Sequence, residues 1–100
     1  MTNKYPNIRF LRLEQEDLNR IRQKKTTELV KDIIGSTYEL QFQASVYDCQ
    51  YLQALYDELE YRLDNDLLDN KLRAIILQRG IPRTKNLREA LEEVSGWEVE

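Results

Sequence analysis

The stretch that decides the fold runs from Thr37 to Asp64 and reads TYELQFQASVYDCQYLQALYDELEYRLD. It holds neither glycine nor proline, and its apolar residues return at the spacing of an α-helix. The first apolar stripe consists of Tyr38, Phe42, Cys49, Leu52, Tyr56, Leu59 and Leu63. This pattern predicts one helix over residues 37–64, with Cys49 on the core side, where a free cysteine behaves as a small hydrophobic residue.

A second interpretation applies to the beginning of this stretch. Apolar and polar residues alternate from Tyr38 to Val46, which is typical of a half-buried strand. A strand around residues 37–47 would make the fold α+β. The helix accounts for more residues because the apolar stripe continues as far as Leu63, so we predict an all-α fold.

The residues before this stretch predict a first long helix. From about Phe10 to Ile34 the apolar residues again follow helical spacing. Gly35 stands where a glycine commonly ends a helix, and Ser36 with Glu39 matches a capping box at the start of the next one. A connection this short predicts an antiparallel hairpin of two long helices. One continuous, kinked helix is the alternative at this point.

Two shorter C-terminal helices are predicted after the hairpin. The polar residues 64–66 interrupt the second helix and can cap a third one over about 67–79. The segment Gly80–Pro82 is a stop signal for that helix. Asn86 is a cap-like start for a fourth helix over about 87–94.

The length and composition suit one globular unit with no catalytic apparatus. We expect a single helical domain over residues 1–100, with a lead-in at 1–9 and an acidic tail at 96–100. The chain has no histidine, which excludes the Ser-His and Cys-His nucleophilic pairs. Its one cysteine cannot form an internal disulfide. Neither a signal peptide nor an apolar run long enough to cross a membrane is evident, so we expect a cytoplasmic protein.

No cofactor, metal or small-molecule substrate is predicted. Asp57, Glu60 and Asp64 share one side of the predicted helix, and carboxylates can hold divalent cations. A solvated acidic face is the ordinary explanation for such a group. The chain also lacks a glycine-rich phosphate loop and a nucleophile elbow, so we do not expect an enzyme.

A second apolar stripe on the 37–64 helix predicts a protein interface. It consists of Leu40, Ala44, Tyr47, Tyr51, Ala54 and Tyr61, roughly opposite the first stripe. One neighbouring helix can cover only one of the two stripes. The shorter helices, a second copy of the chain, or a foreign partner could cover the other. Tyrosine is enriched at interfaces, so the candidate interface residues are Leu40, Tyr47, Tyr51, Tyr61 and Trp97, although Trp97 can instead pack on the body of the protein.

Charge is segregated along the chain, although the net charge is only −3. Residues 32–69 carry nine acids and a single base, Arg62, whereas residues 70–88 carry six bases and no acid. The basic segment contains Lys71, Arg73, Arg79, Arg83, Lys85 and Arg88. These residues are candidates for contact with nucleic acid or with an acidic protein partner. Pairing with the acidic residues 57–69 is the structural alternative.

Part of this basic segment also resembles a known module. The run from Leu72 through Gly80 and Pro82 to Leu87 is similar to the helix–loop–helix of SAP-type DNA-binding modules, but its loop length differs and it lacks the second loop glycine. The sequence therefore predicts a non-enzymatic protein-interaction or regulatory module, as a homodimer or as a subunit of an assembly. A nucleic-acid-binding regulator that uses residues 71–88 is the alternative.

Overall fold

The computed structural model describes residues 13–42, 45–82 and 86–97, and these residues form five helices and no strand. The helices are α1 (Gln15–Gln23), α2 (Thr26–Leu40), α3 (Val46–Asp64), α4 (Asn70–Arg79) and α5 (Leu87–Ser95). The predicted all-α class is confirmed. The alternative strand around 37–47 is wrong, because residues 37–40 belong to α2 and residues 46–47 to α3. The predicted lead-in at 1–9 and the end of the acidic tail lie outside the described residues.

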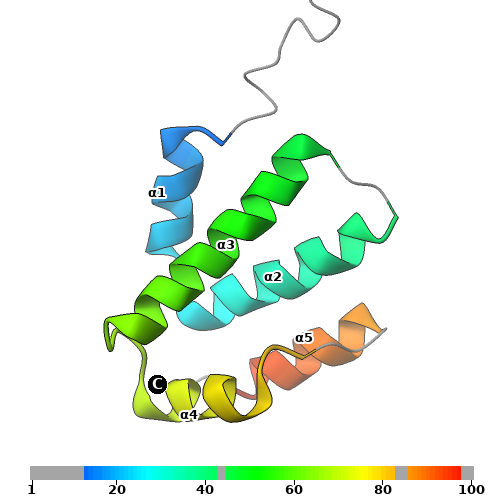
Figure 1. Ribbon diagram of the computed structural model, residues 1–100. Coiled ribbons are helices and arrows are strands. Elements are labelled where there is room, and N and C mark those ends of the chain that lie inside the picture. Colours follow the sequence, from blue (N-terminus) through cyan, green and yellow to red (C-terminus); the bar gives the residue numbers. More distant parts are fainter. Residues whose placement is uncertain (1–12, 43–44, 83–85, 98–100) are drawn as a thin grey trace, which may run out of the picture.

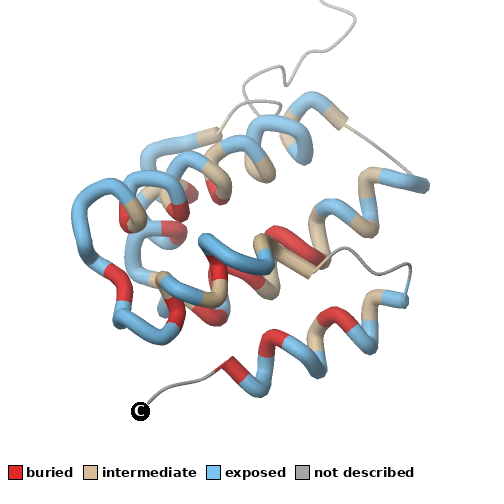
Figure 2. The backbone as a smooth tube through the Cα atoms, turned by 60° about the horizontal axis from the view of Figure 1, so that its bottom comes forward, coloured by how far each residue is buried: buried red, intermediate tan, exposed pale blue. Residues whose placement is uncertain are grey.

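Helix α2 is the centre of the arrangement, with α3 on one side and α5 on the other (Figure 1). Helices α2 and α3 run in opposite directions, and α1 packs against α3. The buried segments turn toward neighbouring helices while the outward sides stay exposed (Figure 2). The apolar core consists of Ile21, Leu29, Val30, Ile33, Ile34, Leu55, Leu59, Leu68, Leu72, Ile76, Ala90, Val94 and Trp97.

The first predicted long helix is in fact two helices. Lys24 and Lys25 adopt extended backbone and separate α1 from α2. The cause is a side chain far along the chain, because Arg62 Nη2 donates hydrogen bonds to the carbonyl oxygens of Ile21 and Arg22 at 3.4 and 3.2 Å. In an unbroken helix these carbonyls would accept from the backbone four residues later. Arg62 donates to both carbonyls here, and the Ile21 carbonyl also accepts from the Lys24 backbone N–H at 3.2 Å.

The predicted helix boundary at Gly35 is wrong. Helix α2 continues through Gly35 and Ser36 to Leu40, so the capping box predicted for Ser36 and Glu39 does not start a helix. A glycine inside a helix costs about 1 kcal/mol relative to alanine. Burial of Ile33 and Ile34 just before it offsets this cost.

The predicted single helix over 37–64 is also wrong, because its residues divide between α2 and α3. The true start of α3 is Ser45, whose Oγ accepts a hydrogen bond from the Asp48 backbone N–H at 3.0 Å. The same Oγ donates to Asp48 Oδ2 at 2.7 Å. The predicted hairpin of two long helices that meet at Gly35 is therefore not confirmed, because α2 ends at Leu40 and α3 begins at Val46.

The two C-terminal helices follow the prediction closely. Asp69 caps α4 by accepting from the Lys71 N–H at 2.8 Å, so the cap comes a few residues after the expected 64–66 segment. Gly80 ends α4 with φ of 70°, which is the left-handed conformation that glycine adopts readily. Asn86 caps α5 by accepting from the backbone N–H groups of Arg88 and Glu89.

Candidate protein-interaction surface

The tyrosine stripe predicted as an interface is largely covered within the chain. Tyr47 and Tyr51 are half-buried, and their rings stack with centroids 6.1 Å apart. Helix α1 packs beside them, and the Asp17 carboxylate of α1 lies close to Tyr47. Burial raises the pKa of both tyrosines, and the negative charges of Asp17 and Asp32 add to the rise. Both phenols therefore remain neutral at pH values above about 10, which is the ordinary pKa of tyrosine.

The covering helix is not one of the two expected at the C-terminus. Because the extended residues Lys24 and Lys25 divide the first long helix, α1 and α2 contact α3 separately. Helix α2 makes the more extensive contact with α3, and α1 lies beside Tyr47 and Tyr51. Two short helices can cover both apolar stripes, which one straight helix could not do.

The other predicted interface residues are dispersed. Leu40 is half-buried at the end of α2, and Tyr61 is 56% exposed near the opposite end of the α2–α3 pair. Trp97 is only 4% exposed and belongs to the core, so its ring packs on the body of the protein. Cys49, predicted on the core side of α3, is exposed. It lies about 60° around the helix from Leu52, at the edge of the apolar stripe.

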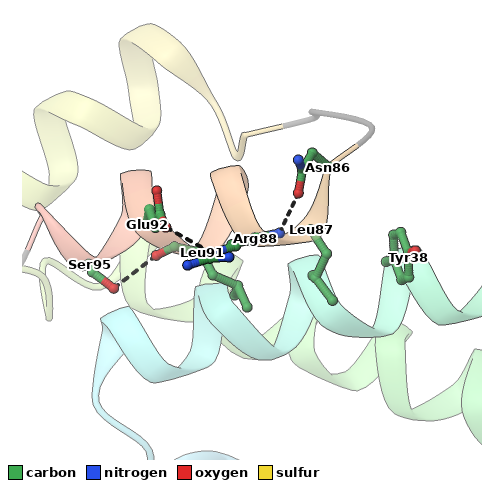
Figure 3. Close-up of a pocket in the computed structure, with 7 residues that line it drawn as sticks. All are labelled: Tyr38, Asn86, Leu87, Arg88, Leu91, Glu92 and Ser95. Carbon is green, nitrogen blue, oxygen red and sulfur yellow. Dashed lines mark hydrogen bonds and ion pairs between the residues drawn. The ribbon is translucent and has the colours of Figure 1, made fainter.

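A groove between α2 and α5 brings Tyr38, a residue of the first predicted apolar stripe, together with two leucines of α5 (Figure 3). Its volume is ≈ 710 Å³. Its apolar lining comes from Tyr38 of α2 and from Leu87 and Leu91 of α5, and both leucines point toward α2. These three side chains are each half-buried, so part of their surface stays open to solvent.

The polar groups at this groove are already engaged with one another. Arg88 Nε and Glu92 Oε1 form an ion pair at 3.3 Å, one turn apart on α5. Asn86 caps the helix, and Ser95 Oγ donates to the Leu91 carbonyl at 2.9 Å. The groove therefore offers mainly apolar surface to a ligand.

Phe42 extends this groove beyond the end of α2. Its ring packs edge-on against Tyr38, with centroids 5.1 Å apart, and it is 73% exposed. Phe42 and the three apolar residues that line the groove, Tyr38, Leu87 and Leu91, are called the α2–α5 strip below. Sequence periodicity placed Phe42 and Tyr38 on an apolar stripe, but periodicity cannot tell whether a neighbouring helix reaches that stripe.

Two of the described residues of the predicted basic segment are paired with acidic side chains. Arg73 is paired with Asp66, which is a pair of the kind expected if the basic and acidic segments neutralise each other. Arg88 is paired with Glu92 on its own helix. Lys71 and Arg79 lie in the first and last turns of α4. Arg83 and Lys85 lie outside the described residues.

Two other features are absent from the described part of the chain. The described ranges hold no group of three or more acidic or cysteine side chains arranged to hold a metal ion. No described helix is both long and apolar enough to cross a membrane. No protein-family model matches the chain, and neither does any curated protein or solved structure with which it was compared.

Proposed function

We propose that this chain is a non-enzymatic protein-interaction module that binds a helix of a partner protein on the α2–α5 strip. The observation that supports this proposal is the exposure of Phe42, the highest among the large apolar side chains described. Its ring packs against Tyr38, which in turn lines the groove between α2 and α5. Burial of apolar surface contributes about 25 cal/mol per Å², and contiguous exposed apolar surface commonly marks an interaction site.

The shape of the strip suits a helix. Two packed helices, α2 and α5, form its walls, and a third helix can lie in the groove between them. Leu87 and Leu91 are one turn apart on α5. A partner helix with apolar residues at three- and four-residue spacing would place them against Phe42, Tyr38 and these leucines.

A partner helix fits this strip better than a second copy of the chain does. The other exposed large apolar residues of the described chain are Val46, Tyr61, Leu67 and Leu77. Val46 and Tyr61 lie at opposite ends of α3, Leu67 precedes α4, and Leu77 is in α4. The groove would accept two large apolar side chains that lie one turn apart on a helix. No described helix of a second copy exposes such a pair.

The test is affinity capture from native lysate by the full chain and by two matched variants, with nuclease treatment throughout. Phe42→Ser removes the exposed ring of the strip, whereas Leu77→Ser removes another exposed apolar side chain, which is 64% exposed on α4. We expect proteins that bind directly to be retained by the parent chain and by Leu77→Ser, and lost with Phe42→Ser. Circular dichroism checks that both variants remain folded.

Two results would contradict the proposal. Capture that is the same for Phe42→Ser and the parent chain would show that the strip is not the binding surface. Capture that disappears with nuclease would favour the nucleic-acid alternative. Sedimentation velocity at rising concentration tests the homodimer. A dimer that Phe42→Ser abolishes would show that a second copy of the chain occupies the strip in place of a partner helix.

A further inference from the structure

Helix α1 has the lowest share of apolar residues among the five described helices. Only two of its nine residues, Leu18 and Ile21, are apolar, and of these Leu18 is only half-buried. Helix α5 has the same length but carries four apolar residues, and Trp97 just behind it is buried as well. Because burial of apolar surface holds a helix on its neighbours, α1 is held less firmly than α5.

The contacts that fix α1 to other helices are concentrated at its end. Ile21 is 2% exposed, and Arg62 of α3 donates to the carbonyl oxygens of Ile21 and Arg22. Immediately after the helix, Lys24 forms an ion pair with Asp32 of α2 at 2.8 Å. The last turn of α1 is therefore joined to both α2 and α3.

The first turns of α1 are stabilised mainly from within. The Asp17 carboxylate accepts from the Glu14 backbone N–H and pairs with Arg20. Gln15 Nε2 donates to Asn19 Oδ1 at 3.0 Å. These interactions support the helix but do not join it to α3. A helix of nine residues is marginal in isolation, so the first turns persist only while they are packed on the rest of the protein.

The part of α3 beside these turns carries the stacked pair Tyr47 and Tyr51. Both are half-buried, and Tyr47 lies close to the Asp17 carboxylate. The packing between the two helices is incomplete, because a groove of ≈ 430 Å³ remains between Leu18 of α1 and Ala54 of α3. Side chains that line such a space lack partner atoms on one side, which lowers the cost of separating the helices.

We propose that the first turns of α1 are a cover over the tyrosine pair, which unwinds from its start while the other helices stay folded. Arg62 and Ile21 hold the end of α1 in place during this opening. The open state exposes Tyr47 and Tyr51, and tyrosine is enriched at interfaces, so the cover would control access to this surface. The device does not depend on the α2–α5 strip, and either proposal can fail alone.

Native-state hydrogen exchange of the ¹⁵N-labelled full chain tests this proposal without any substitution. Exchange is measured at rising urea concentrations below the unfolding transition. We expect the amides of α1 to exchange through an opening whose equilibrium constant is at least about tenfold larger than for the amides of α2 and α3. Equal opening in all three helices would show that α1 opens only when the whole chain unfolds, and would overturn the proposal.

Nitration by tetranitromethane, located by tandem mass spectrometry, reports on the tyrosines themselves. All proteins carry Cys49→Ser at that exposed position, because the reagent also oxidises thiols. Leu18→Ala removes apolar contact between α1 and α3. It should raise the nitration rates of Tyr47 and Tyr51 by about fivefold, equivalent to about 1 kcal/mol. Tyr61 is already 56% exposed and should react at an unchanged rate.

Leu91→Ala is the matched control, because Leu91 is also half-buried but lies on α5. It should leave the nitration rates of Tyr47 and Tyr51 unchanged, and circular dichroism checks that both variants remain folded. Rates that Leu18→Ala does not change, or that Leu91→Ala raises equally, would also overturn the proposal.

Discussion

The two ends of the α2–α3 pair are built in different ways. At the end where α2 begins, the Arg62 guanidinium is buried and hydrogen-bonded to Glu58 Oε2 at 2.7 Å, to Thr26 Oγ1 at 3.2 Å, and to two carbonyls at the end of α1. At the end where α2 stops, Phe42 and Val46 point into solvent. One end joins three helices through a polar network, and the other leaves apolar side chains uncovered.

This difference separates structural from interaction residues. A buried charge is costly unless it is paired and hydrogen-bonded, so the network at Arg62 must form whenever the chain is folded. An exposed phenylalanine gains little from folding, because its ring stays largely in water in both states. Under the proposed function, Phe42 would instead be buried against the partner helix. Mutations at the two ends should therefore affect stability and binding in opposite proportions.

The largest expected effect is that of Arg62→Ala. It leaves the largely buried Glu58 carboxylate and the Arg22 carbonyl without the Arg62 donor, and we expect the free energy of unfolding to fall by about 3–5 kcal/mol. Urea denaturation followed by circular dichroism measures the change. Arg73→Ala is the matched control, because its partner Asp66 is exposed and the loss should stay below about 1 kcal/mol. Equal losses for the two variants would mean that Arg62 is not the structural link between the helices.

The second effect concerns Asp17, which lies in the first turn of α1 and stabilises the start of that helix. Asp17 Oδ2 accepts from the Glu14 N–H at 3.0 Å, and the carboxylate also pairs with Arg20. The Glu14 hydrogen bond, more than Arg20 or Tyr47, holds the pKa of Asp17 below its ordinary value. We expect Asp17→Asn to cost about 1 kcal/mol at neutral pH, as the loss of a helix cap commonly does.

The pH dependence of this effect has a definite sign. A lowered pKa means that the ionised carboxylate is favoured in the folded state, so its contribution is complete above the ordinary aspartate value of about 3.9. The contribution disappears as pH falls through the lower, folded-state pKa of Asp17. The stability difference between the parent chain and Asp17→Asn should therefore shrink in acid. A difference that stays constant down to pH of about 2 would argue against this role.

The third prediction tests the middle of α2, between the two ends. Gly35 lies inside the helix, and a Cβ there would meet no neighbouring atom. Gly35→Ala should therefore raise the free energy of unfolding by about 0.5–1 kcal/mol. Gly80→Ala is the opposite control, because φ of 70° at Gly80 is strained for any side chain and should lower stability. If Gly35→Ala instead lowers the free energy of unfolding, the result would support the helix boundary at Gly35 that the sequence alone indicates.

The smallest effect on stability is expected at the apolar end. Phe42→Ser should change the free energy of unfolding by no more than about 0.5 kcal/mol, as is usual for exposed positions. Thermal unfolding of the two proteins side by side measures this. A loss well above 1 kcal/mol would assign Phe42 to the fold and remove the contrast between the two ends.

Much of the helical organisation could be predicted from the sequence because its signals are local. Asn86 begins α5 as expected, and Gly80 ends α4 in the backbone conformation that glycine favours. Each of these signals depends on hydrogen bonds or dihedral angles within a few residues. The candidate site could not be predicted in the same way. Phe42 and Cys49 share an apolar stripe with Leu59, yet only Leu59 is buried.

The sequence by itself determined that the chain is helical, which residues form apolar stripes, and where the last two helices lie. Only the tertiary structure decided where the first helices divide and which stripes are covered. The break at Lys24 and Lys25 is stabilised by Arg62, about 40 residues away, and α2 continues through Gly35 where a local signal predicts its end. The physical reason is the distance along the chain over which each signal acts, because helix caps and helical periodicity involve residues within one or two turns of each other. Burial and long-range hydrogen bonds exist only once the helices have packed.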